Sequence, residues 1–281
     1  MDAVLLAATS ALLFGAMTVA IRIALGRGAG AEAGALFAVL VALAVTLPFT
    51  VVEGAELTEL WPFLLAGLLG PGLSTLLFTL AVREAGPART SVVVGTAPLF
   101  SVAIAFVFLD EALRAGLVAG AILIVAGGLL LVSERDRPEH VRILGLAFAL
   151  TATVAFAVRD NILRWLAIDT DVPPAAAATA TLAAAAALIA AYLLTTRAPV
   201  GLRDARAFVP AGVLFGFSYI CLFEAYYRGL VTVVSPLVAT ESLWGVLLSA
   251  VVLRQSERVG VRLAAGALLV VCGGVLIGAF R

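Results

Sequence analysis

Apolar segments long enough to cross a lipid bilayer follow one another along almost the whole chain. A helix of about 20 apolar residues spans the roughly 30 Å hydrocarbon core. Because lipid offers no hydrogen bonds to the backbone, such segments must be helical. We therefore predict an all-α integral membrane protein with ten transmembrane helices. The ten segments are residues 3–24, 33–52, 62–82, 90–109, 115–132, 143–166, 174–195, 208–227, 231–253 and 262–280.

Composition excludes several classes of protein. Of the 281 residues 63% are hydrophobic and 13% are charged, whereas soluble domains are nearer a half and a quarter. The sequence thus indicates a multi-pass protein of the cell membrane. Its net charge is zero and it has no lysine, which argues against nucleic acid as a partner. Cys221 and Cys272 lie in apolar runs and His140 in a charged connection, so we expect no metal and no cofactor.

The second half of the sequence repeats the first. Matches of Ala or Leu are common in so apolar a chain, but a Glu and three glycines at fixed spacing are not. At an offset of 144 positions, one set matches: Leu99, Val102 and Leu109 fall on Leu243, Val246 and Leu253. At an offset of 146, a second set matches: Glu111, Gly120, Gly127 and Gly128 fall on Glu257, Gly266, Gly273 and Gly274.

These matches predict two domains, residues 1–132 and residues 143–281, joined by a hydrophilic connection over residues 133–142. Each domain contains five of the predicted helices. Because five is odd, the second copy enters the membrane in the opposite sense, which makes the pair an inverted repeat. In transporters of this construction the substrate site lies near the bilayer midplane between the halves.

The spacing of Pro, Glu and Gly resembles that of the drug/metabolite transporter superfamily, specifically its EamA-type ten-helix members. The first copy carries the pattern Pro98, Leu109-Asp110-Glu111, Gly120 and Gly127-Gly128, and the second carries Glu241-Ser242, Leu253, Glu257, Gly266 and Gly273-Gly274. The resemblance implies secondary transport of small organic solutes without ATP. It also implies that helices 1–4 and 6–9 surround a central cavity, with helices 5 and 10 outside. Two departures affect helix 9: Ser242 replaces a common Pro, and two extra residues precede Glu257.

Four charged residues lie at least three residues from either end of an apolar segment, all in the second repeat: Arg159, Asp160, Glu224 and Glu241. A charge at mid-bilayer costs about 2.5–3.5 kcal/mol, so each is a candidate functional residue. Glu241 is the strongest candidate for binding a substrate ammonium or a proton. On a continuous helix it would share a face with Trp244, Leu237, Val238 and Gly245. The alternative is a buried structural ion pair.

The other candidates have simpler explanations beside the functional one. Glu224 precedes Arg228 by four residues, which also suits an ion pair at a helix end. Arg159 and Asp160 are supporting site residues, and Arg159 lies at a depth that permits a cross-helix pair with Glu224. Four aromatic residues are candidates for lining a cavity, although packing is their commoner role. They are Phe14, Phe156, Tyr219 and Trp244.

The function that fits these features is secondary transport of a small polar metabolite, with an amino acid or amine favoured and export preferred, and with coupling to protons through Glu241. One alternative is uptake of a quaternary ammonium solute such as choline, held by Glu241, Trp244 and Tyr219. An alternative of another class is a membrane receptor or scaffold that transports nothing. An enzyme is disfavoured because the sequence has no HExxH, GxSxG or Walker motif.

Two further hypotheses concern assembly and orientation. Gly116-xxx-Gly120 and Gly274-xxx-Gly278 have the spacing that lets helices approach closely, within the chain or in a homodimer. The positive-inside rule places both termini outside the cell, whereas the resembled family implies termini in the cytoplasm. Thirteen arginines lie on one predicted side, at positions 22, 27, 83, 89, 135, 137, 142, 197, 203, 206, 254, 258 and 262, and four on the other, at 114, 164, 228 and 281.

Overall fold

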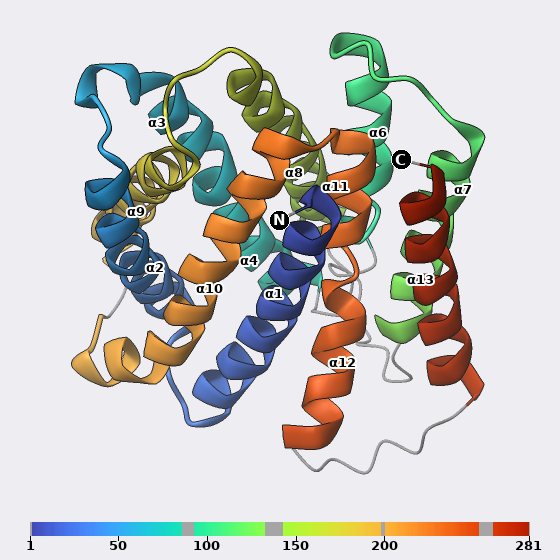
Figure 1. Cartoon of the computed structure of the whole chain (residues 1–281). Helices are drawn as coiled ribbons and strands as arrows, with labels where there is room; N and C mark the ends of the chain where they lie inside the picture. Colours follow the sequence, from blue (N-terminus) through green and yellow to red (C-terminus); the bar gives the residue numbers. More distant parts are fainter. Residues whose placement is uncertain (1, 86–92, 133–142, 198–199, 253–260, 281) are drawn as a thin grey trace.

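The computed structural model describes residues 2–85, 93–132, 143–197, 200–252 and 261–280, and within these ranges every regular element is helical (Figure 1). His140 and Glu257 lie outside the described residues. The elements are α1 Ala3–Gly26, α2 Ala31–Glu53, η1 Leu57–Glu59, α3 Trp61–Gly67, η2 Leu68–Leu73, α4 Ser74–Ala85, α6 Ala97–Phe108, α7 Ala115–Val132, α8 Ile143–Ile168, α9 Pro174–Thr196, α10 Leu202–Arg228, α11 Val231–Val238, α12 Glu241–Val252 and α13 Val261–Phe280.

Six helical stretches of the described chain are long and apolar enough to cross a membrane. They are Ala3–Gly26, Ala31–Glu53, Trp61–Phe78, Ile143–Ile168, Pro174–Thr196 and Ala205–Arg228. Each coincides with one of the predicted segments. The apolar helices found at predicted segments 4, 5 and 10 are shorter than these six stretches. Predicted helix 9 is divided into α11 and α12. The all-helical prediction is confirmed for the described residues.

The predicted third helix is interrupted at its Gly- and Pro-containing centre. Gly70 has non-helical torsion angles (φ −149°, ψ 120°), so α3 and α4 are separated by the π-helical segment η2. Pro71 follows and has no backbone N–H to continue the helical ladder. This interruption also has a tertiary role, because a Cβ at Gly70 would lie only 2.8 Å from the Cδ of Arg159.

The predicted fourth and ninth helices are broken at positions that the repeat makes equivalent. Turns at Gly95-Thr96 and Ala239-Thr240 precede α6 and α12, and they lie 144 positions apart. The two threonines make the same bond: the Thr96 hydroxyl donates to Val93 O (2.6 Å), and the Thr240 hydroxyl donates to Leu237 O (2.7 Å).

The break in helix 9 corrects one prediction about Glu241. Leu237 and Val238 were expected on its helical face, but they end α11, whereas Glu241 begins α12. The cause is local: the backbone N–H of Thr240 bonds Leu237 O at 3.1 Å and that of Leu243 bonds Thr240 O at 3.0 Å. These hydrogen bonds join residues that are three positions apart, whereas α-helical bonds join residues four apart, so the α-helix is interrupted here.

Close helix pairs hold the bundle together. α10 packs against α1 and α2, and α7 packs against α13 at one edge of the bundle (Figure 1). Between α1 and α10 the buried hydroxyls of Ser10 and Ser218 each donate to the other residue's carbonyl oxygen, at 3.0 and 2.9 Å. A Cβ at Gly116 would lie 2.3 Å from the Phe280 ring, and one at Gly120 would lie 2.7 Å from Ile277. These two glycines therefore allow α7 to pack closely against α13 within the chain.

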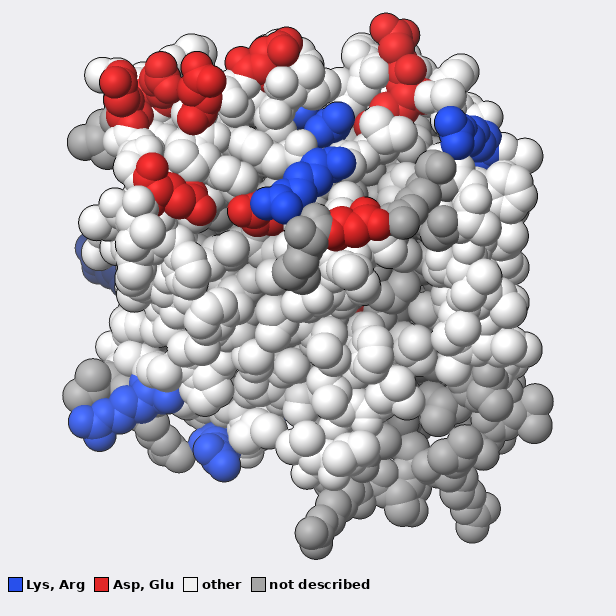
Figure 2. All heavy atoms as spheres, in the orientation of Figure 1, with Lys and Arg blue, Asp and Glu red and all other residues white. Residues whose placement is uncertain are grey.

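On the face shown in Figure 2, charged side chains gather toward the two ends of the bundle, and the surface between them is mostly uncharged. Carboxylates gather at the end where α2, α6 and α8 finish, and this acidic end is defined by Glu53, Glu56, Glu59, Asp110, Asp169 and Asp171. Arginines mark the opposite end, where α1 and α9 finish and α10 begins. This arginine-rich end is defined by Arg22, Arg27, Arg197 and Arg206.

Candidate functional site

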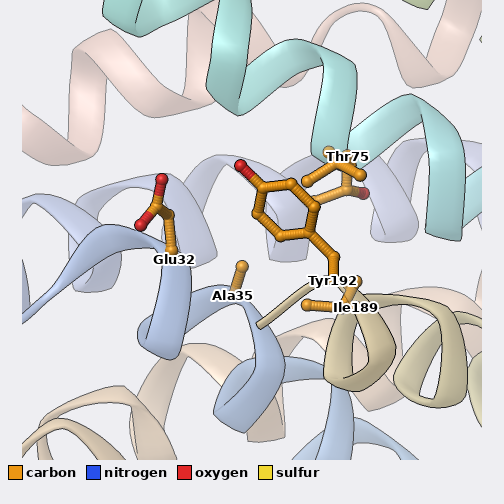
Figure 3. A pocket seen from close by; sticks show the side chains of 6 residues that line it. Glu32, Ala35, Thr75, Ile189 and Tyr192 are labelled. Atoms are coloured by element: carbon orange, nitrogen blue, oxygen red, sulfur yellow. The ribbon is translucent and has the colours of Figure 1, made fainter. Parts of the chain in front are cut away.

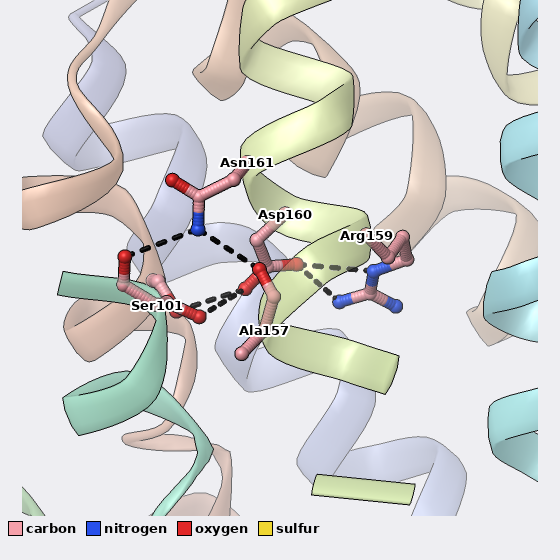
Figure 4. Close-up of polar contacts among 6 residues, drawn as sticks. Ser101, Ala157, Arg159, Asp160 and Asn161 are labelled. Atoms are coloured by element: carbon pink, nitrogen blue, oxygen red, sulfur yellow. Dashed lines mark hydrogen bonds and ion pairs between the residues drawn. The ribbon is translucent and has the colours of Figure 1, made fainter. Parts of the chain in front are cut away.

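An ion pair is buried in the middle of the bundle, on α8. The guanidinium of Arg159 donates from Nε (3.0 Å) and Nη2 (2.6 Å) to Oδ1 of Asp160, its neighbour in sequence (Figure 4). Arg159 and Asp160 are 9% and 5% exposed. The Arg159 guanidinium also lies over the Phe156 ring, 5.2 Å from its centroid. A buried charge is tolerated when it is paired and hydrogen-bonded in this way.

The second oxygen of Asp160 connects α8 to two other helices. Oδ2 accepts hydrogen bonds from the hydroxyls of Ser235 on α11 (2.9 Å) and Ser101 on α6 (3.3 Å). Next to it, the side-chain amide of Asn161 donates to Ser101 O (3.0 Å) and to Ala157 O (2.9 Å), as Figure 4 shows. The Asp160 carboxylate thus accepts four hydrogen bonds, two at each oxygen, which fills its acceptor positions.

Glu224 does not pair with Arg159. It forms an ion pair with Arg228 one helical turn away, near the end of α10. The Arg164 guanidinium lies nearby and donates to Tyr226 O at 2.9 Å. A cation near a helix C-terminus satisfies carbonyl groups that have no intrahelical partner. Glu224 therefore lies in a helix-end cluster away from the Arg159–Asp160 pair.

Glu241 differs from the other two candidate carboxylates, Asp160 and Glu224, in having no partner among the described residues. It begins α12 at the break in helix 9, and its carboxylate makes no hydrogen bond or ion pair with any described residue. Glu241 is an exposed residue on the surface of the chain. Gly15 of α1 packs against this break, because a Cβ there would lie 2.6 Å from Trp244 Cβ and 3.0 Å from Glu241 O.

The predicted aromatic residues fall into two groups. Tyr219 and Phe14 belong to a buried cluster, with their rings edge to face at 6.3 Å, and Phe215 adds a further contact 4.9 Å from Tyr219. Phe156 contacts Arg159, whereas Trp244 is half-buried one turn along α12 from Glu241. The structure therefore brings Phe156 to the ion pair and Trp244 to Glu241, and it places Phe14 and Tyr219 in packing contacts.

Several polar residues near the ion pair were not singled out from the sequence. Ser101, Asn161 and Ser235 bond within the cluster, and Tyr226 is 1% exposed with no hydrogen-bond partner for its hydroxyl among the described residues. Asn161 directly follows Asp160 in an apolar run, which is a usable signal. Single Ser and Tyr residues are too common in membrane helices to be recognised without the tertiary contacts.

Two surface pockets lie away from this cluster. One, between α2, α4 and α9, is lined by Glu32, Thr75 and Tyr192, but its volume of about 10 Å³ holds little more than a water molecule (Figure 3). The other lies at the acidic end, has a volume of about 260 Å³ and is lined by residues that include Trp165 and Asp169. Neither pocket contains a predicted site residue. Among the described residues, no group of His, Cys, Asp and Glu is arranged to hold a metal ion.

Comparison with protein families agrees with the repeat. The model of the EamA-like transporter family matches the chain twice, over residues 1–133 and 143–279. The chain belongs to the EamA-like transporter family. The resemblance noted from the Pro, Glu and Gly spacing is thereby confirmed, and the protein is a multi-pass membrane protein of a transporter family.

Other comparisons concern the fold. No curated protein matches this EamA-like chain. A solved structure titled only "Crystal structure of protein" aligns with a TM-score of 0.86 at 22% sequence identity, and the alignment covers 99% of each chain. At that identity the likeness shows the fold alone.

Proposed function

We propose that this EamA-like protein is a secondary transporter that carries a small polar solute bearing an amine, an amino acid or a simple amine, and that Glu241 binds its ammonium group. The proposal rests on the contrast between two carboxylates that lie within apolar segments. Asp160 is saturated by Arg159, Ser101 and Ser235, whereas Glu241 is accessible and unpaired among the described residues.

The charge balance of the central region supports a cationic group. Arg159 and Asp160 neutralise each other, so Glu241 leaves one uncompensated negative charge. An unpaired carboxylate surrounded by apolar segments is stabilised by an ammonium group or by a proton. The same carboxylate would then alternate between proton and substrate, which couples export of the solute to proton entry.

The backbone around Glu241 supports a binding site there. Transporters with inverted repeats bind substrates at broken helices near the midplane, where backbone groups freed by the break face the substrate. Both breaks in this chain, at Thr96 and Thr240, are in corresponding positions of the two repeats. The buried hydroxyls of Tyr219 and Tyr226 lie beside Arg159 and Asp160 and add polar groups to the central region.

The proposed mechanism also requires a particular number of membrane spans. We propose that the segments containing α6, α7, α11–α12 and α13 also cross the bilayer, which brings the number of spans to ten. The two five-helix repeats, residues 1–132 and 143–281, then move relative to each other to expose the site alternately on each side. Gly116 and Gly120 pack against α13 within the chain, so these two glycines are not available for a homodimer contact.

The test is efflux from liposomes that contain the purified protein. The liposomes are loaded with amino acids, amines, quaternary ammonium compounds and sugars, and mass spectrometry follows what leaves, with and without a pH gradient. We expect amine-bearing solutes to leave faster than from protein-free liposomes. Glu241→Gln removes a charge-assisted contact worth about 1.5–3 kcal/mol, so it slows this efflux roughly ten- to a hundredfold and abolishes its response to the gradient.

Glu224→Gln is the matched control, because it removes the same charge from the same repeat at a residue that is paired with Arg228. We expect it to retain wild-type efflux. Equal efflux from wild type and Glu241→Gln at every pH would refute the role of Glu241. If no solute leaves faster than from protein-free liposomes, the transport proposal itself is wrong for this panel.

A further inference from the structure

A second buried carboxylate joins the two repeats at the acidic end. Glu111 follows α6 and is 6% exposed. Its Oε1 accepts a hydrogen bond from the backbone N–H of Val231 (2.8 Å), and its Oε2 accepts one from the N–H of Thr232 (2.9 Å). These are the first two residues of α11, so a side chain of the first repeat caps a helix of the second.

The turn after α6 places Glu111 for this contact. Asp110 adopts a left-handed conformation (φ 52°), and the N–H of Glu111 bonds back to Ala105 O at 3.3 Å. The carboxylate then meets the α11 N-terminus, whose first N–H groups have no intrahelical partners. Ionised carboxylates accept such bonds strongly and also interact favourably with the positive end of the helix dipole.

The same two helices are joined a second time, deeper in the bundle. Asp160 Oδ2 accepts from Ser101 on α6 and from Ser235 on α11. α6 is one part of broken helix 4 and α11 is one part of broken helix 9. Glu111 and Asp160 thus connect α6, from the first repeat, to α11, from the second. Glu111 does so at the acidic end and Asp160 at the central ion pair.

We propose that Glu111 and Asp160 form a latch that closes the transport path at the acidic end, and that α6 and α11 separate there when the path opens to that side. The latch is defined by Glu111 with the N–H groups of Val231 and Thr232, and by Asp160 with Ser101 and Ser235. This inference rests on the proposed transport function, which supplies the need for alternate opening. Glu111 acts as a positioning residue and touches no substrate.

The experiment measures how often the latch opens, without any substrate. Thr232 is fully buried and its hydroxyl has no partner among the described residues, so Thr232→Cys is a near-isosteric reporter. The background carries Cys221→Ala and Cys272→Ala, which removes the native thiols. The rate of reaction with a water-soluble thiol reagent is then measured for the protein in nanodiscs.

Glu111→Gln keeps one acceptor oxygen but loses the charge and one of the two bonds. We expect it to raise the reaction rate of the reporter roughly ten- to a hundredfold, the factor that a charge-assisted hydrogen bond supplies. Amide hydrogen exchange at Val231 and Thr232 is expected to rise by a similar factor. Asp110→Asn is the matched control, since it removes a charge from the adjacent exposed residue and Asn tolerates its positive φ.

Ser101→Ala separates a latch from a local helix cap. It removes the hydrogen bond to Asp160, at the other end of the interface between α6 and α11. If the latch opens as a unit, Thr232→Cys reacts faster in this variant as well. If Glu111 is only a local helix cap, the reaction rate of Thr232→Cys does not change. Because Ser→Ala is mild, it also carries the test if Glu111→Gln fails to fold. Wild-type labelling rates in Ser101→Ala, or equal rates in Glu111→Gln and Asp110→Asn, overturn the proposal.

The outcome is distinguishable from that of the transport proposal. Faster labelling in a protein that moves no solute would uphold the latch and reject the proposed function. Unchanged labelling in a protein that transports an amine would do the reverse.

Discussion

At the scale of single residues, three carboxylates of this chain have three different environments because their partners differ. Asp160 is held by a guanidinium and two hydroxyls, Glu111 by two backbone N–H groups, and Glu241 by no described residue. A carboxylate whose acceptor positions are filled stabilises the fold. A carboxylate with open positions remains available for a ligand, which is why Glu241 rather than Asp160 carries the functional proposal.

The Arg159–Asp160 pair leads to a stability prediction. Asp160→Asn leaves the buried Arg159 without its counter-charge, and breaking a buried ion pair at one partner costs about 3–5 kcal/mol. We expect a lower free energy of unfolding of that order for the detergent-solubilised protein. Glu224→Gln breaks a more exposed helical pair with Arg228 and is expected to cost less than about 1 kcal/mol. Similar losses in both variants would contradict the structural role assigned to Asp160.

At the scale of elements, the two broken helices show how a repeat preserves geometry through different residues. Pro98 lies in the first turn of α6, where its fixed φ and missing N–H are tolerated. Ser242 occupies the matching place in α12, and the break persists there, with the backbone N–H of Thr240 bonded to Leu237 O and that of Leu243 bonded to Thr240 O. The departure at Ser242 therefore does not restore a continuous helix 9.

The contact between α1 and this break provides a prediction at the level of helix packing. A methyl group at Gly15 would approach Trp244 Cβ to 2.6 Å, so Gly15→Ala forces α1 away from α12. Overpacking of this kind costs typically about 1–3 kcal/mol, and here it also displaces Glu241. We expect Gly15→Ala to lower the unfolding temperature and to slow efflux in the liposome assay.

Gly26 is the control for Gly15 because it lies in the same helix, where a Cβ would meet nothing within 4 Å. Gly26→Ala is expected to be neutral or slightly stabilising, since Ala favours helix over Gly by about 1 kcal/mol at most. If Gly15→Ala behaves like Gly26→Ala, the close approach of α1 and α12 is not needed for function.

At the scale of the whole molecule, the charges at the two ends predict an orientation in the membrane. The arginine-rich end contains Arg22, Arg27, Arg197 and Arg206, and the positive-inside rule places it in the cytoplasm with both termini outside. Thr58 is the middle residue of η1 at the acidic end and Thr196 ends α9, and both are exposed. They provide one reporter position for each face.

Single cysteines at these two positions, in a background with Cys221→Ala and Cys272→Ala, test the orientation. With an impermeant thiol reagent on intact cells, we expect labelling of Thr58→Cys but not of Thr196→Cys, which reacts only after the membrane is permeabilised. The opposite pattern would place the termini in the cytoplasm, as the resembled family implies, and would show that the charge bias does not set the orientation.

The sequence by itself determined the all-helical class and the family, and it located six of the spans. Segments 143–166 and 174–195 were predicted within two residues of α8 and α9, because the bilayer sets the length of an apolar helix. The offset of 144 positions relates the two breaks although neither break was predicted. An apolar run predicts a membrane span, but it carries little signal for a short turn inside that span.

Only the tertiary structure decided which charged and polar groups meet. Arg159 pairs with Asp160 rather than Glu224, and Asp160 meets Ser101 and Ser235, 59 and 75 positions away. Glu111 reaches the start of α11 across 120 positions. Such contacts depend on how helices of two repeats are packed side by side. Hydropathy cannot contain that information, because it records the water-to-lipid preference of each residue and not its neighbours in space.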